Sequence, residues 1–446
     1  MSRVTGARIF TLEVHVNRFS KFAAVTAATT LAIGVFSATP ASAATFYDPP
    51  ADLPSGNGTV LRTEPMKLAL NLNLPGGAST IPGKATRIMY KSTDQLGVPV
   101  AVTGAYIAST KKWTGKGERP LVAFGPGTQG QGDSCAPSKS LESLIHIENG
   151  EFGIGYEVLN IYDFLNRGVN VVMTDFVGMG TTDRVATYTN REDMGHSLLD
   201  AARAAISMPG NSISTSAPIG LYGYSQGGGA AGAAAELAPS YAPELNIKGS
   251  YVGAPPANLL EVTKSADGAG LVGVIAYAIN GLMAYYPEAH PLLDSKVNQK
   301  GRDALEKAKT QCIGSTLTSF GFTKTSKWTK DGKSAYETVK SEPLLLKAVN
   351  DQRIGNLKPS IPVQVLTGTQ DDLVDHGQVK QLAKDWCGKG VKVDYVPVIQ
   401  PIGSFGTGLN HLGPAVTNLP SSHNWLMDRM AGKSATSNCG LLWLMP

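Results

Sequence analysis

Short apolar segments that alternate with helical segments constrain the fold of this chain more than any other feature of its sequence. A strand that is apolar throughout needs cover on both faces, and helices between successive strands supply that cover. The expected strands are residues 121–124, 169–174, 219–222, 363–367 and 391–398, and the expected helices are residues 158–167, 197–207, 228–237 and 378–386. The pattern therefore predicts an α/β fold with a mostly parallel central sheet and helices on both faces.

Three parts of the chain depart from this alternation. Residues 90–108 predict an antiparallel hairpin, and residues 44–84 predict an N-terminal arm because they begin with many prolines and glycines. Residues 255–355 are largely helical and contain no clear strand, so we expect an inserted helical cap, or lid. The core of the fold is then expected to comprise residues 85–254 and 356–446.

Residues 1–43 have the three parts of a secretory signal peptide. Basic residues come first, an apolar run follows at Phe22–Ser37, and Ala41-Ser42-Ala43 forms a cleavage site. The run is shorter than the about 20 residues that a membrane-spanning helix needs. We therefore expect a secreted, extracellular protein that is cleaved near Ala43 and has no transmembrane anchor in its mature chain.

The composition of the mature chain excludes several functions. The signal segment contains four of the 39 basic residues and one of the 35 acidic residues, so the remainder is nearly neutral and favours no nucleic-acid partner. Neither C-x-x-C nor H-E-x-x-H occurs, and no P-loop is present, so we expect no metal and no cofactor. The even number of cysteines (Cys135, Cys312, Cys387 and Cys439) favours two disulfides, for which the sequence allows three pairings.

The segment Gly223-Tyr224-Ser225-Gln226-Gly227 matches the pattern G-x-S-x-G. Alone it is a weak signal, because the chain is rich in glycine. Its context is more specific: it follows a short apolar strand and opens the Ala/Gly-rich helix at Gly228–Ala235, which is the setting of a nucleophile elbow. We therefore predict Ser225 as a catalytic nucleophile in an α/β-hydrolase fold.

A nucleophilic serine needs a histidine base and an acid that orients it, and in α/β-hydrolases the chain order is Ser, Asp, His. Asp371 comes just after an expected strand and is the predicted acid, with Asp372 and Asp375 as rivals. His411 comes directly after the last expected strand and is the predicted base, with His423 as its competitor.

Backbone N–H groups must also stabilise the oxyanion that forms during acyl transfer. One donor is expected at Gln226, the residue after the nucleophile. The second is expected in the Gly-rich loop 125–131, where Gln129 is the first choice and Thr128 the next.

Several further motifs give the chain a family resemblance. They are residues 135–138 (Cys-Ala-Pro-Ser), 223–227, 237–246 (Leu-Ala-Pro-Ser-Tyr-Ala-Pro-Glu-Leu-Asn), 298–302 (Asn-Gln-Lys-Gly-Arg), 371–374 (Asp-Asp-Leu-Val) and 410–412 (Asn-His-Leu). With these motifs the chain resembles the secretory lipase family of α/β-hydrolases, the group of yeast lipase A, over about residues 45–440. The resemblance implies a Ser225/Asp371/His411 triad, a helical lid, and the bridges Cys135–Cys312 and Cys387–Cys439.

The expected function is that of a secreted serine lipase. It would cleave acylglycerols or other long-chain carboxylic esters through an acyl-enzyme, with a lipid interface as one setting for the reaction. Apolar residues of the expected cap would line an acyl tunnel or face lipid: Leu271, Val272, Val274, Ile275, Tyr277 and Ile279. Two alternatives remain open, an acyltransferase that uses the same acyl-enzyme and a catalytically silent lipid-binding relative.

Overall fold

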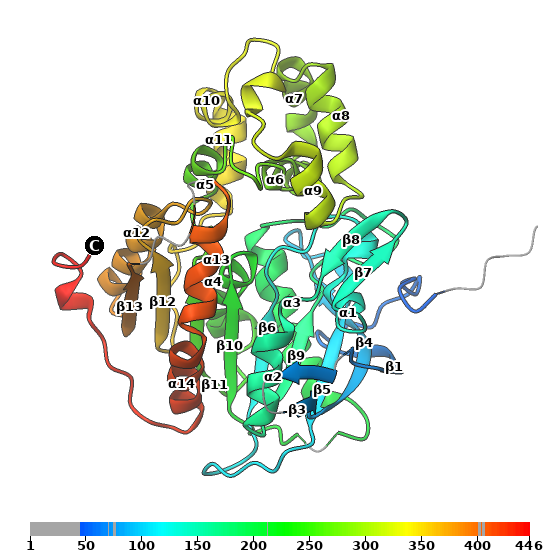
Figure 1. The fold of residues 1–446 in the computed structure, drawn as a ribbon, viewed down its shortest axis with the longest axis vertical. Helices are drawn as coiled ribbons and strands as arrows, with labels where there is room; N and C mark the ends of the chain where they lie inside the picture. The colour runs from blue at the N-terminus through cyan, green and yellow to red at the C-terminus, as the bar shows by residue number, and fades with distance from the viewer. Residues whose placement is uncertain (1–44, 70, 75–76, 212, 400–402, 404–405) are drawn as a thin grey trace, which may run out of the picture. The chain divides into compact units, whose positions relative to one another are not determined.

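The computed structural model describes residues 45–446 except residues 70, 75–76, 212, 400–402 and 404–405 (Figure 1). The expected signal peptide and its cleavage site therefore lie outside the described residues. In the part of the chain that is described, no helix combines the length and apolar character that a membrane span requires.

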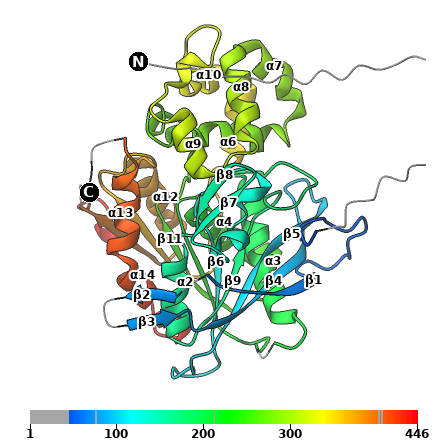
Figure 2. The same cartoon turned by 45° about the vertical axis from the view of Figure 1, so that its right-hand side comes forward.

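A nine-stranded sheet runs through the described part of the chain (Figures 1 and 2). Its strands lie in the order β1 (Val60–Met66), β4 (Gly83–Thr93), β5 (Pro99–Ser109), β9 (Asn170–Thr174), β6 (Leu121–Gly125), β10 (Ile219–Tyr224), β11 (Ile247–Gly253), β12 (Val363–Gly368) and β13 (Val393–Val398). The strands from β9 to β13 in this order are parallel. β1, β4 and β5 extend one edge in antiparallel fashion. The predicted α/β-hydrolase class, with its mostly parallel sheet, is confirmed.

The expected helices and the expected hairpin occur with shifted ends. The helices are α2 (Val158–Asn166), α3 (Arg191–Ser207), α4 (Gln226–Tyr241) and α12 (His376–Gly388), and β4 and β5 form the hairpin. The segment expected as an N-terminal arm contributes β1 and a small hairpin of β2 (Asn71–Leu74) and β3 (Gly77–Thr80). A further hairpin, β7 (Ile145–Glu148) with β8 (Glu151–Ile154), follows the short helix α1 (Pro137–Ser140).

The sequence prediction missed β11, which lies between β10 and β12. Its sequence, Ile-Lys-Gly-Ser-Tyr-Val-Gly, has no continuous apolar run. Small residues are needed there because neighbouring elements come close. The Ser250 hydroxyl donates to the Ala231 carbonyl of α4 at 3.0 Å, and a Cβ at Gly249 would lie 2.8 Å from the Arg429 side chain. Tertiary packing rather than strand propensity makes this segment a strand.

Alternate residues of the central strands face two different cores. In β6, Leu121 and Ala123 pack in the core that α3, α4 and α12 cover. Val122 and Phe124 pack in the other core, with α2 and α14 (Leu419–Met430). Helices therefore cover both faces, as the apolar strands require.

Residues 255–355, all of which are described, form helices and contribute no strand to the nine-stranded sheet. The α-helices are α5 (Leu259–Ser265), α6 (Val274–Met283), α7 (His290–Lys296), α8 (Gln299–Ala308), α9 (Ile313–Phe320), α10 (Ala335–Ser341) and α11 (Pro343–Asp351). The chain enters this insertion from the carboxyl end of β11, and both ribbon views show its helices grouped beyond that end of the parallel strands (Figures 1 and 2). The insertion thus lies at the sheet edge where α/β enzymes place their active sites.

Candidate active site

A serine in a strained turn joins β10 to α4. Ser225 has φ +57° and ψ −123°, which non-glycine residues rarely adopt, and its N–H donates to the Gly253 carbonyl at 2.9 Å. The flanking glycines leave no room for a side chain. A Cβ at Gly223 would lie 2.0 Å from the Gly227 carbonyl oxygen, and one at Gly227 would lie 1.9 Å from that of Gly125. The turn therefore has the geometry of a nucleophile elbow.

Asp371 and His411 form a buried hydrogen-bonded pair. His411 belongs to α13 (Leu409–Thr417), and its Nδ1 lies 2.7 Å from Oδ2 of Asp371. The other carboxylate oxygen accepts the backbone N–H groups of Leu373 and Val374 at 3.0 and 2.8 Å. Because a carboxylate oxygen accepts, Nδ1 is the donor of this bond, and Nε2 has no hydrogen-bond partner among the described residues. In a neutral imidazole held in this way, Nε2 is the nitrogen whose lone pair can accept a proton.

Two neighbours hold the backbone of His411. Asp372 accepts the N–H of His411 at 3.1 Å through one oxygen and that of Gly408 at 2.9 Å through the other. The Tyr224 hydroxyl donates to the His411 carbonyl at 2.6 Å. Burial and the nearby charge of Asp371 raise the pKa of Tyr224 well above its ordinary value, so this donor stays protonated. The sequence predicted Asp372 only as a rival acid and predicted no role for Tyr224. No spacing rule reveals the contact that either residue makes with the backbone of His411.

The remaining rivals from the sequence have other partners. Asp375 caps α12 and accepts the N–H of Gln378 at 3.0 Å. His423 lies in α14, where Nδ1 is 2.6 Å from Asp163, and its ring stacks on Phe164 at 4.0 Å. Burial lowers the pKa of His423 despite the neighbouring carboxylate. Both residues therefore make contacts that stabilise helix ends and helix packing.

Ser225 and the loop that follows β12 meet at a small cavity. Ser225 lines a cavity of about 30 Å³ together with Leu373 and Val374, the residues whose N–H groups hold Asp371. Ile275 and Ala278 of the insertion line the same cavity. The structure thus places the predicted nucleophile beside the loop that carries the predicted acid, and the insertion covers both.

The two predicted oxyanion donors are both buried. Gln226 is the first residue of α4, so its N–H belongs to the group that a helix leaves unpaired at its positive end. Gln129 follows β6, and its carbonyl accepts the N–H of Ile313 from the insertion at 2.8 Å. The preceding Thr128 shares a hydrogen bond between its hydroxyl and that of Tyr188 at 2.8 Å. The loop between β6 and α1 is therefore fixed at the edge of the site.

The four cysteines form two bridges. Cys135 is bonded to Cys312 and Cys387 is bonded to Cys439, which are the pairs that the family resemblance implies. The first bridge ties the segment after the Gly-rich loop to the start of α9, and the second ties α12 to the C-terminal segment. No group of three or more His, Cys, Asp or Glu side chains that could hold a metal ion occurs among the described residues.

Comparison with known proteins relates this chain to lipases. A family model described as Secretory lipase matches residues 146–438. A probable inactive lipase of Mycobacterium tuberculosis, MT1628, is 27% identical over 88% of this chain and 83% of its own length. The secreted triacylglycerol lipase LIP2 of Malassezia globosa is 25% identical over 88% of this chain and 82% of its own length.

Solved structures share the fold at lower identity. Lipase A of Candida antarctica in its closed state has a TM-score of 0.74 and 19% identity, covering 89% of this chain and 88% of that one. The rice cell wall degrading esterase LipA from Xanthomonas oryzae has a TM-score of 0.68 and 16% identity, covering 84% of this chain and all of that one. These likenesses place the described part of the chain in the α/β-hydrolase fold of lipases and esterases.

Proposed function

Since the chain belongs to the secretory lipase family, and is therefore a carboxylic ester hydrolase, we propose that it is a secreted serine lipase acting on acylglycerols or other long-chain esters. The observation that carries this proposal is the buried Asp371–His411 hydrogen bond, which orients the imidazole while its Nε2 has no partner among the described residues. The loop that contains Asp371 shares a cavity with the strained Ser225. In the proposed triad, Ser225 is the nucleophile, His411 the general base and Asp371 the group that orients the imidazole.

The proposed reaction has two half-reactions through one acyl-enzyme. His411 Nε2 takes the Ser225 proton while the oxygen attacks the ester carbonyl, and then gives that proton to the leaving alcohol. Water repeats the sequence and releases the fatty acid. Asp371 stabilises the imidazolium because its other oxygen is held by two backbone donors and cannot turn away. The N–H groups of Gln226 and Gln129 are the proposed donors to the tetrahedral oxyanion.

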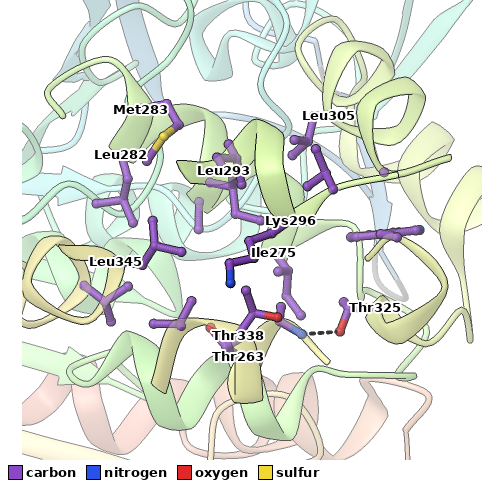
Figure 3. A pocket seen from close by; sticks show the side chains of 18 of the residues that line it. Thr263, Ile275, Leu282, Met283, Leu293, Lys296, Leu305, Thr325, Thr338 and Leu345 are labelled. Atoms are coloured by element: carbon purple, nitrogen blue, oxygen red, sulfur yellow. Dashed lines mark hydrogen bonds between the residues drawn. The ribbon is translucent and has the colours of Figure 1, made fainter. Parts of the chain in front are cut away.

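An apolar cavity inside the insertion supports an acyl-binding role for these helices (Figure 3). Its volume is about 80 Å³, and it is lined by residues of α5 to α8, α10 and α11. Four residues line both this cavity and the one that contains Ser225, namely Leu259, Thr263, Ile275 and Ala278. In our proposal the acyl chain passes these four residues into the insertion. Of the residues that the sequence singled out, Val274, Ile275 and Ile279 line one or both cavities.

The volumes of both cavities are too small for a long acyl chain. A cavity of about 150 Å³ is known to hold benzene in another protein, and the two volumes here are smaller. We therefore propose that residues 255–355 act as a lid whose helices separate when substrate binds. The closed arrangement buries apolar residues of α6 against the site. In water this burial favours the closed lid, whereas contact with lipid would remove the cost of exposing α6 and would favour the open lid.

Exposed apolar side chains offer a surface for a lipid interface. Ile145 and Ile147 of β7 are 65% and 72% exposed, and Ile154 of β8 is 43% exposed. This hairpin packs on α9, where Leu317 and the following Phe322 are 43% and 62% exposed. Single exposed apolar residues are common, but five on adjoining elements at the insertion suit a partly nonpolar partner. We propose that these five residues contact lipid.

We propose that the chain is exported by its first 43 residues, which fits the secreted lipases among its relatives. Mass spectrometry of protein from culture medium would give the first residue. A mature chain that begins next to Ala43 supports the proposal, and a chain that retains Phe22–Ser37 contradicts it.

The catalytic proposal is tested by kinetics of the wild type and Ser225→Ala on nitrophenyl esters of increasing chain length and on a triglyceride emulsion. We expect activity on long chains and emulsion, and a loss of at least about 10³-fold in kcat in the variant. Ser240→Ala, on the same helix with its hydroxyl bonded to the Leu237 carbonyl, is the matched control and should keep wild-type rates.

The other outcomes separate the alternatives. Ester activity that survives in Ser225→Ala would contradict the nucleophile assignment. A Ser225-dependent transfer of the acyl group to an added alcohol in preference to water would favour an acyltransferase. No Ser225-dependent reaction with any of these substrates would indicate a silent lipid-binding relative.

A further inference from the structure

The loop that carries the predicted donor Gln129 is contacted by two residues just ahead of α2. Glu157 accepts the N–H of Gly127 at 2.6 Å, and the Tyr156 hydroxyl donates to the Thr128 carbonyl at 2.8 Å. Neither contact follows from a motif, since the two segments are about 30 residues apart in the chain. The two bonds fall on successive residues of the loop, so together they fix both its position and its direction.

The bond from Tyr156 fixes a peptide group that matters for catalysis. The Thr128 carbonyl and the Gln129 N–H belong to the same planar peptide, in which they point in opposite directions. Holding the carbonyl on the Tyr156 side therefore aims the Gln129 N–H the other way. On the far side of Gln129, its own carbonyl is held by the N–H of Ile313, so the donor cannot rotate about either flanking bond without losing a partner.

We infer that Tyr156 and Glu157 are positioning residues that preorganise the oxyanion hole, with Tyr156 orienting the Gln129 N–H and Glu157 fixing the backbone before it. This inference rests on the proposed function, because it takes the Gln129 N–H to be the oxyanion donor. Preorganised donors stabilise a transition state without a reorganisation cost at the moment of reaction. The two residues act on the rate through Gln129 and do not touch the substrate.

Packing around the loop leaves little space for an alternative arrangement. A Cβ at Gly127 would lie 2.7 Å from the Tyr156 hydroxyl oxygen and 3.3 Å from Oε1 of Glu157. Glu157 is buried, and its second oxygen accepts from the Asn160 amide at 3.2 Å. Asn160 in turn accepts from the Tyr222 hydroxyl of β10 at 2.8 Å. The loop is thus connected through Glu157 to the packed core beneath α2.

The test uses Tyr156→Phe, Glu157→Leu and Glu157→Gln, with steady-state kinetics on one soluble nitrophenyl ester. Loss of an orienting bond reduces the stabilisation of the transition state but leaves substrate binding unchanged. We therefore expect kcat to fall about 10-fold or more in Tyr156→Phe and Glu157→Leu, with KM unchanged. Glu157→Gln retains an oxygen that can accept from Gly127, so it should recover most of the kcat lost in Glu157→Leu. Tyr90→Phe removes a buried hydroxyl bonded to the Ser197 carbonyl and should leave both constants unchanged.

The outcomes distinguish this inference from the proposed function. A wild type without Ser225-dependent activity refutes the proposed function itself. An active wild type with unchanged kcat in Tyr156→Phe refutes the positioning role, and so does a Glu157→Gln enzyme as slow as Glu157→Leu. If circular dichroism shows that Glu157→Leu does not fold, the kcat of Tyr156→Phe tests the positioning role. This variant removes only one hydroxyl from a partly exposed residue, so we expect it to fold.

Discussion

Replacing Glu157 by glutamine should make the free energy of unfolding less dependent on pH. Burial raises the pKa of Glu157 from an ordinary 4.5 to about 7, although bonds from Gly127 and Asn160 partly offset it. In the unfolded chain this carboxyl releases its proton near pH 4.5, whereas in the folded chain it keeps the proton until about pH 7. The stability that it contributes is therefore complete below pH 4.5 and is lost as the pH rises through 7.

The size of the effect follows from the shift in pKa. Each unit is worth about 1.4 kcal/mol, so a change from 4.5 to about 7 corresponds to about 3 kcal/mol for this buried group. The groups that face it are uncharged donors: the Gly127 N–H, the Asn160 amide and the hydroxyls of Tyr156 and Tyr222. His423 lies beyond Asn160, and burial lowers its pKa, which disfavours its charged form.

The assay is equilibrium urea unfolding of wild type and Glu157→Gln between pH 4.5 and 8.5. The difference in unfolding free energy, wild type minus variant, should fall by about 3 kcal/mol across this range, and any constant cost of the amide cancels. A control of opposite sign is Glu148→Gln. Burial raises the pKa of Glu148, but bonds from Lys139 and His146 outweigh it and lower that pKa, so the wild-type advantage should shrink toward acid pH. A Glu157 difference that stays constant within about 0.5 kcal/mol would refute the reasoning.

Three other changes test separate parts of the site. Asp372→Ala removes the acceptor for the N–H groups of His411 and Gly408 and should lower kcat about 10²-fold, whereas Asp375→Ala should cost only about 1 kcal/mol of α12 capping in urea unfolding. Leu345→Trp should fill the cavity in the insertion and lower kcat/KM for a palmitate nitrophenyl ester at least about 10-fold relative to a butyrate ester; equal losses would contradict an acyl site there. Removing both cysteines of the 135–312 bridge, which spans 177 residues, should cost about 5 kcal/mol, against about 4 kcal/mol for the 387–439 bridge, which spans 52. In the native state at low temperature, only loss of the first bridge should also lower kcat, because only that bridge adjoins the Gly-rich loop.

The sequence predicted those parts of the fold that local rules govern. The apolar strands could be found because both of their faces are buried, and the elbow could be found because Gly223 and Gly227 admit no side chain. β11 could not, because its small residues are dictated by α4 and α14 on either side. These packing contacts join β11 to residues far away in the sequence, so the seven residues of the strand do not reveal them.

The same distinction applies to the site. Asp371 and His411 were chosen from their order and their places after strands, and the structure joins them by a hydrogen bond; their catalytic roles and that of Ser225 stay predictions. The backbone contacts of Asp372, Tyr156 and Glu157 were not predicted, because each contact is made to a segment distant in sequence. A contact of this kind depends on how two loops meet, and no residue type or spacing encodes it.

The contacts of the Gly-rich loop also restrict how the proposed lid can open. On one side the loop is held by Tyr156 and Glu157 from the core. On the other side it is held by the N–H of Ile313 and by the bridge through Cys312, at the start of α9. A motion that carried the start of α9 away would pull on the loop and misalign the Gln129 N–H. The start of α9 should therefore stay with the core, so that opening is achieved by α5 and α6, the helices whose residues line both the cavity in the insertion and the one that contains Ser225.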